Sequence, residues 1–113
     1  MPKGIMVVKS RPADPSREDE FNKWYSDVHL PELLDVPGFT RARRYKISPT
    51  GADPEQREYV TVYEIDADDL HAPMTELRAR GKAGLTHRSD SVQSDPPPVI
   101  TIYELIDDQS SKD

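Results

Sequence analysis

His29 is the residue with the clearest capacity for chemistry in this 113-residue sequence. Imidazole ordinarily titrates near neutral pH, so His29 could give or take a proton. Tyr25 lies four residues earlier, one helical turn away, and its hydroxyl could donate a hydrogen bond to a carbonyl or an oxyanion. The pair predicts proton transfer by His29 assisted by Tyr25. A histidine that bonds a helix-end carbonyl and a tyrosine that packs in the core are the alternatives.

Further candidates for substrate binding lie on predicted strands and on one loop. In the alternation of residues 39–48, Arg43 and Tyr45 share a face with Phe39, whereas Arg44 points to the opposite face. An inward-facing arginine could bind a carboxylate or phenolate through two hydrogen bonds, or pair with an internal Asp or Glu. Packing or surface exposure is the alternative throughout. The predicted substrate-binding residues are Trp24, Arg43, Tyr45, Tyr63, His87 and Tyr103.

Composition and motifs exclude several classes of function. The chain has no cysteine, and its histidines, at positions 29, 71 and 87, lack the spacing of a metal site. Glycine-rich nucleotide motifs and a Gly-x-Ser-x-Gly elbow are also absent, so we expect no metal and no cofactor. A net charge of −6 gives no basis for binding nucleic acid or an anionic membrane. The apolar run at residues 5–8 is too short for a signal peptide or a membrane span, which favours a soluble cytoplasmic protein.

An aromatic stripe positions His29 at the end of a helix. Its members are the aromatic residues Phe21, Trp24 and Tyr25, together with Val28, at helical spacings of three and four. The helix begins either with Ser16 and Asp19 as a capping box or with Asp14 followed by Pro15 at the first helical position. In both cases His29 lies at the edge of its apolar face, facing a half-buried space. Pro31 cannot donate a backbone hydrogen bond, so we expect a kink or a restart there before Pro37-Gly38 turns the chain into the next strand.

The remaining elements complete a βαββαβ order. Strands are predicted at residues 4–10, 39–48, 58–66 and 99–106, with a turn-rich loop at 49–54 and a polar loop at 85–98. A second helix carries Leu70, Met74 and Leu77, with Pro73 in its first turn and Gly81 or Gly84 at its end. Right-handed crossovers then place both helices on one face of a four-stranded antiparallel sheet, as in ferredoxin-like folds. We expect a single domain at 1–107 and a disordered polar tail at 108–113.

The second face of this sheet predicts self-association. The strands are rich in Val, Ile and Tyr on both sides, and helices cover only one of them. A contiguous apolar face of this size usually marks an interface. The sequence therefore predicts a homodimer that packs through its sheets.

The stretch "EFNKWYSDVHLPELLDVPGFTRARRY" resembles the dimeric α/β-barrel superfamily, and its EthD-like branch in particular. The specific part is a pattern in which aromatic residues precede a histidine and a proline, followed by Pro-Gly-aromatic. Members of this superfamily include small, often cofactor-free enzymes that oxygenate, isomerise, dehydrate or cyclise aromatic and polyketide-like molecules. The resemblance implies a ligand cleft within each protomer, between the helices and the sheet.

Three functions follow as expectations. The first is a cofactor-independent lyase, dehydratase or isomerase, in which His29 moves a proton on an aromatic or polyketide-like molecule. The second is a cofactor-free monooxygenase, which needs a substrate that can become a carbanion and react with oxygen. The third is a non-catalytic homodimer that binds a small hydrophobic ligand or scaffolds a partner. An enclosed pocket with His29 in its wall favours chemistry, and a filled core favours scaffolding.

Overall fold

The computed structural model describes residues 3–48 and 57–112, so the predicted loop at 49–54 lies outside the described residues. The strands are β1 (Lys3–Ser10), β2 (Phe39–Lys46), β3 (Tyr59–Asp66) and β4 (Val99–Glu104). The helical elements are η1 (Pro15–Arg17), α1 (Glu18–Trp24), η2 (Tyr25–His29), α2 (Leu30–Leu34) and α3 (Ala72–Lys82). Each predicted helix and strand is present. Residues 105–112 form no regular structure.

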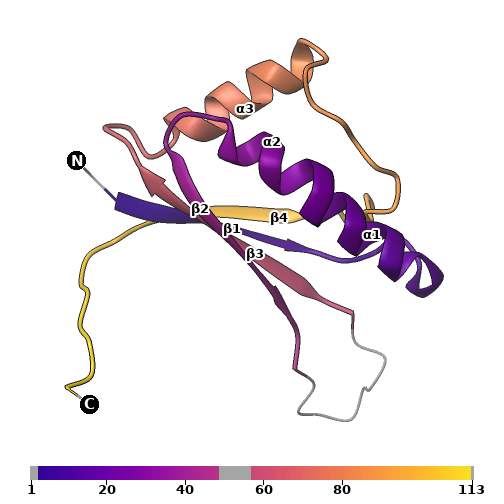
Figure 1. Cartoon of the computed structure of the whole chain (residues 1–113), viewed down its shortest axis with the longest axis horizontal. Helices are drawn as coiled ribbons and strands as arrows, with labels where there is room; N and C mark the ends of the chain where they lie inside the picture. Colours follow the sequence, from indigo (N-terminus) through magenta and orange to yellow (C-terminus); the bar gives the residue numbers. More distant parts are fainter. Residues whose placement is uncertain (1–2, 49–56, 113) are drawn as a thin grey trace.

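The four strands form one antiparallel sheet in the order β2-β3-β1-β4. The α1–α2 segment and α3 both lie over one face of this sheet, as Figure 1 shows. This arrangement confirms the predicted ferredoxin-like fold. The core fills the space between the α1–α2 segment and the sheet, and its buried residues are Met6, Val8, Leu33, Val36, Phe39, Tyr63 and Ile65.

The aromatic stripe forms the buried face of the first helical segment. Phe21 is fully buried, and Tyr25 is 2% exposed. The segment is continuous but contains a π turn at η2, where the Leu30 amide donates to the carbonyl of Tyr25, five residues earlier. Pro31 lies in the first turn of α2, where its missing N–H costs little. The expected restart at Pro31 is not observed: the chain continues from η2 into α2 without a break, and the irregularity is the π turn that precedes the proline.

A β-bulge at the start of β2 reverses the predicted facing of two arginines. Phe39 pairs with Ile65 and Arg41 pairs with Glu64, so β2 uses one more residue than β3 over this step. Beyond the bulge Arg44, rather than Arg43, faces the helices. The prediction that Arg43 and Tyr45 share the face of Phe39 is wrong, because the extra residue shifts the alternation by one.

The outer face of the sheet, which we define by Ile5, Val7, Tyr45, Val60, Val62, Val99 and Tyr103, carries no helix. Tyr45 is 50% exposed and Tyr103 is 52% exposed. The same face also carries Lys9, Arg41, Arg43 and Glu64, so it is less uniformly apolar than the sequence predicts.

No helix within the described parts of the chain is long and apolar enough to span a membrane.

Candidate functional site

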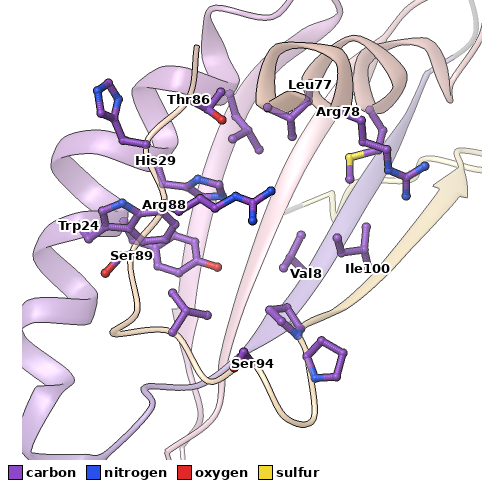
Figure 2. A pocket seen from close by; sticks show the side chains of 18 of the residues that line it. Val8, Trp24, His29, Leu77, Arg78, Thr86, Arg88, Ser89, Ser94 and Ile100 are labelled. Carbon is purple, nitrogen blue, oxygen red and sulfur yellow. The ribbon is translucent and has the colours of Figure 1, made fainter. Parts of the chain in front are cut away.

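A pocket of about 630 Å³ lies between the sheet, the α1–α2 segment, α3 and the loop at residues 83–98 (Figure 2). Met6 and Val8 of β1 and Ile100 of β4 line it from the sheet. Trp24, Tyr25, His29 and Leu33 line it from the first helical segment, and Met74 and Leu77 from α3. The sequence predicted a cleft between helices and sheet, and the pocket occupies that position.

The pocket lies beside the part of α3 that follows its buried first turn. Pro73, at the start of α3, is the buried residue of this helix, whereas Met74 and Leu77 are half-buried and line the pocket. At the same end, Gly38 has φ +102, and a side-chain Cβ there would lie 2.6 Å from Cγ of Pro73. Glycine thus allows the β2 turn to approach α3 closely at one point, and the rest of α3 borders the pocket.

His29 lies in the wall of the pocket, at the junction of the π turn and α2. Its imidazole stacks on the indole of Trp24 at 4.5 Å between centroids and meets the ring of Tyr25 edge-on at 5.1 Å. Burial lowers the pKa of His29 from its usual 6.5 to about 4, with Glu32 opposing and Arg44 assisting the shift. His29 is therefore neutral at pH 7, which the sequence could not show. Its ring makes no hydrogen bond to any other described residue.

Tyr25 serves the core as well as the pocket. Its ring packs edge-on against Phe21, and its hydroxyl lies 3.1 Å from Oγ of Ser10 on β1. Burial raises the pKa of the Tyr25 phenol, so it stays protonated near neutral pH. Both the core role and the pocket role that the sequence left open therefore have structural support. The buried Trp24 Nε1 has no hydrogen-bond partner among the described residues.

Arg44 takes a structural position beneath the first helix. Its guanidinium lies 4.5 Å from the centroid of the Tyr25 ring and also within 5.5 Å of the Phe21 and Tyr59 rings. It donates a hydrogen bond to Oδ1 of Asn22 at 2.9 Å. The inward arginine thus packs on aromatic rings, which favours a cation away from water, and does not line the pocket.

The loop at 83–98 is tied to the first helical segment. The carboxylate of Glu32 accepts hydrogen bonds from the backbone amide of His87, at 3.1 Å, and lies 2.8 Å from Nδ1 of the same residue. Farther along, Arg17 pairs with Asp90 at 2.6 Å, and Ser91 is fully buried. His87 lines the pocket, as expected from the sequence, although its side chain is 79% exposed.

The other predicted site residues lie outside the pocket. Tyr63 is fully buried in the core, where its hydroxyl makes no hydrogen bond of ordinary geometry within the described residues. Arg43, Tyr45 and Tyr103 belong to the outer side of the sheet. The expectation that these side chains reach the cleft is wrong for this protomer, because burial places Tyr63 beneath it and strand alternation turns the others away.

Three cations at the pocket are not among the predicted site residues. Arg78 and Lys82 reach it from α3 and Arg88 from the loop, and all three are exposed. A signal was present, because Arg78 and Lys82 follow Met74 at intervals of four and so share its helical face. No group of three potential metal ligands occurs in the part of the chain that the structure describes.

Solved structures with similar folds are related to this chain at low sequence identity. A dimeric ferredoxin-like protein from an uncultured marine organism is 14% identical, with a TM-score of 0.66 over 96% of this chain and 100% of that one. An ethyl tert-butyl ether D (EthD) family protein from Bacillus halodurans is 16% identical, with a TM-score of 0.55 over 91% and 99%. These structures bear out the resemblance to EthD-like proteins at the level of the fold.

A third similar structure carries a ligand. The monooxygenase from the ActVA-Orf6 gene of Streptomyces coelicolor, in complex with Nanaomycin D, is 15% identical to this chain. Its TM-score is 0.57, over 96% of this chain and 93% of that one.

No curated protein sequence matches the chain. A family model described as "Domain of unknown function (DUF4286)" matches residues 12–88, more than half of the sequence and including the first helical segment, α3 and His87. The chain therefore belongs to the DUF4286 family, within an EthD-like, ferredoxin-like fold.

Proposed function

We propose that this protein is a small, cytoplasmic, cofactor-independent enzyme that transfers a proton on an aromatic or polyketide-like molecule bound in the pocket. The observation that carries the proposal is the position of His29: a neutral imidazole with no hydrogen bond to another described residue, in the wall of an apolar pocket of about 630 Å³. Apolar pockets with a few convergent polar groups are typical of small-molecule sites.

The chemistry requires only a base that returns its proton. A ring nitrogen of His29 takes a proton from a carbon next to a carbonyl, and the C–H electron pair moves into the carbonyl as an enolate. The imidazolium then returns that proton to another atom of the same molecule, which is isomerisation, or to a leaving hydroxyl, which releases water. The low pKa of His29 makes its imidazolium a strong acid, so the return step is favoured. The negative charge that develops on the enolate offsets the cost of a buried cation.

A cofactor-free monooxygenase is the second candidate. The ActVA-Orf6 structure is that of a monooxygenase with Nanaomycin D bound, and its fold matches this chain over nearly its whole length. The first step is shared, because removal of the proton gives a carbanion in either case. The two candidates differ in whether dioxygen then consumes that carbanion.

Solvent exchange of an acidic C–H tests the shared step without knowledge of the substrate. We expect the protein to accelerate deuterium uptake at the α-carbon of 2-tetralone in D2O, followed by NMR. His29→Ala should lower that rate by about 100-fold or more, as loss of a general base does, whereas Lys23→Gln on the exposed side of α1 should not change it. Equal rates for the protein and for His29→Ala would contradict the proposal and favour a non-catalytic binding protein.

Oxygen uptake separates the two enzyme candidates. Anthrone has an acidic C–H whose carbanion reacts with dioxygen, so a monooxygenase should consume oxygen when anthrone is added. Proton exchange without oxygen consumption would support the lyase or isomerase, and His29-dependent oxygen consumption would support the monooxygenase.

We further propose that the outer face pairs with the same face of a second copy. Its exposed Tyr45, Val99 and Tyr103 lie on the same face as three half-buried valines, and the similar marine structure is described as dimeric. Val62→Asp should shift the sedimentation coefficient to that of a monomer, while far-ultraviolet circular dichroism shows that the chain remains folded. A monomeric wild-type protein would contradict this assembly.

A further inference from the structure

The cations around the pocket specify the charge of its ligand. We propose that the pocket takes an aromatic molecule that bears a carboxylate, with its rings on the apolar surface and its anionic group held by Arg78 and Arg88. This inference deepens the proposed function by naming the substrate class, and it rests on that function only in using the same pocket.

Two arginines from different elements line the same pocket. Figure 2 shows Arg88 extending from the loop into the pocket and Arg78 projecting from α3 across from it. Val8, Leu77 and Ile100 line the apolar part. A ligand with its ring against these side chains has guanidinium groups beside it on two elements. Guanidinium groups bind carboxylates through paired hydrogen bonds, and they are stronger partners than neutral donors.

The positive charges of Arg78, Lys82 and Arg88 form no ion pair with another described residue. Other arginines of the same region are paired: Arg17 with Glu20 and Asp90, and Arg80 with Asp35 and Glu76. No ion pair within residues 3–48 and 57–112 involves Arg78, Lys82 or Arg88.

Acidic side chains do not border the pocket among the described residues. Glu32 lies nearby, but its carboxylate is occupied by His87. In a chain of net charge −6, unpaired cations with no carboxylate between them form a local positive field. That field favours an anion over a neutral molecule of the same shape.

The location of Trp24 makes the test direct, since it is the single tryptophan in the sequence and it lines the pocket. Two probes that differ in charge but hardly in shape are 3-phenylpropanoate and 3-phenylpropanamide. Titration of the full chain at pH 7.5, read by Trp24 fluorescence and calorimetry, should give about tenfold tighter binding of the acid, the effect of charge-assisted hydrogen bonds at a partly solvated site. Added NaCl should weaken binding of the acid and leave that of the amide unchanged.

Matched variants assign the preference to these two residues. Arg78→Gln and Arg88→Gln should each reduce the acid-to-amide ratio, and the double variant should bring it to about one. Lys23→Gln removes the same charge from the exposed side of α1 and should leave the ratio unchanged.

The outcomes also separate this inference from the proposed function. Equal affinity of the wild-type protein for acid and amide, or a preference that survives the double variant, would overturn the anion site and leave the role of His29 intact. A preference lost in the double variant, together with His29-independent proton exchange, would keep the anion site and reject the enzyme. Absence of binding by both probes would overturn the anion site, while the exchange of 2-tetralone still tests the role of His29.

Discussion

The α1–α2 segment and α3 lie on the same face of the sheet (Figure 1) but differ in how deeply their side chains are buried against it. The first helical segment packs directly on the strands through Phe21, Tyr25 and Leu33, which are at most 2% exposed. On α3 Pro73 is the buried residue, whereas the half-buried Met74 and Leu77 pack against the edge of the core and also line the pocket. The first segment therefore supplies stability and the second supplies space. A difference of this kind is how a small fold accommodates a ligand without losing its core.

Replacing one leucine by alanine in each of the two helices should have the largest effect and tests this comparison most strongly. Leu33→Ala should lower the free energy of unfolding by about 2–5 kcal/mol, because it creates a cavity in a filled core. Leu77→Ala should lower it by less than about 1.5 kcal/mol, because its half-buried side chain borders space that is already open. Urea denaturation measures both. Equal losses would show that Leu77 is as fully packed in solution as Leu33.

The pH dependence of stability tests how strongly His29 is buried between the first helical segment and the pocket. The unfolded chain protonates His29 near its usual pKa of 6.5, whereas the folded chain resists protonation until about pH 4. The unfolded state thus binds more protons between these values, and stability should fall by up to about 3 kcal/mol as the pH decreases through this window. His29→Asn should lose this part of the pH dependence in urea denaturation from pH 7 to pH 4. An unchanged profile would indicate a solvated imidazole.

Two glycine-to-alanine substitutions test the close contact between Gly38 and Pro73 at the start of α3. Gly38→Ala should cost about 2 kcal/mol, because Gly38 has φ +102 and the added Cβ would meet Pro73. Gly84→Ala, at φ +75 with open space around it, should cost only the backbone strain, about 1 kcal/mol. Thermal unfolding of both variants separates the two contributions. A Gly38→Ala loss no larger than that of Gly84→Ala would show that the contact with Pro73 is not tight.

The smallest expected effect on stability concerns the contact between Glu32 of α2 and His87 of the loop at 83–98. Glu32→Gln removes the charged acceptor for His87, and because His87 is 79% exposed the loss of stability should stay below about 1 kcal/mol. Amide hydrogen exchange at residues 86–89 should nevertheless become several-fold faster, since the loop loses its attachment. Glu76→Gln, which breaks a pair within α3, should leave exchange in the loop unchanged.

Sequence reasoning reached the fold because periodicity encodes which faces are buried. The stripe through Phe21 and Tyr25 predicted the packed helix and placed His29 at the edge of a half-buried space, where the structure has it. It failed at β2, because a single-residue bulge after Phe39 reverses every later side chain and leaves no mark in an alternating pattern. The low pKa of His29 could not be predicted from the sequence either, because this pKa depends on burial by distant segments.

The π turn decides which residues of the first segment can share a core. Tyr25 and Leu33 are eight residues apart, and in an uninterrupted α-helix they would be separated by roughly 800°, or about 80° away from a common face. The wider turn takes up about one additional residue and brings the angle near two full revolutions. Deletion of the exposed Ser26 would leave Tyr25 and Leu33 seven residues apart, roughly 700° in a regular α-helix, so the two side chains would keep a common face without the π turn. The helix can therefore lose one residue here and keep its buried face, whereas one more inserted residue would rotate the aromatic half against the leucine half.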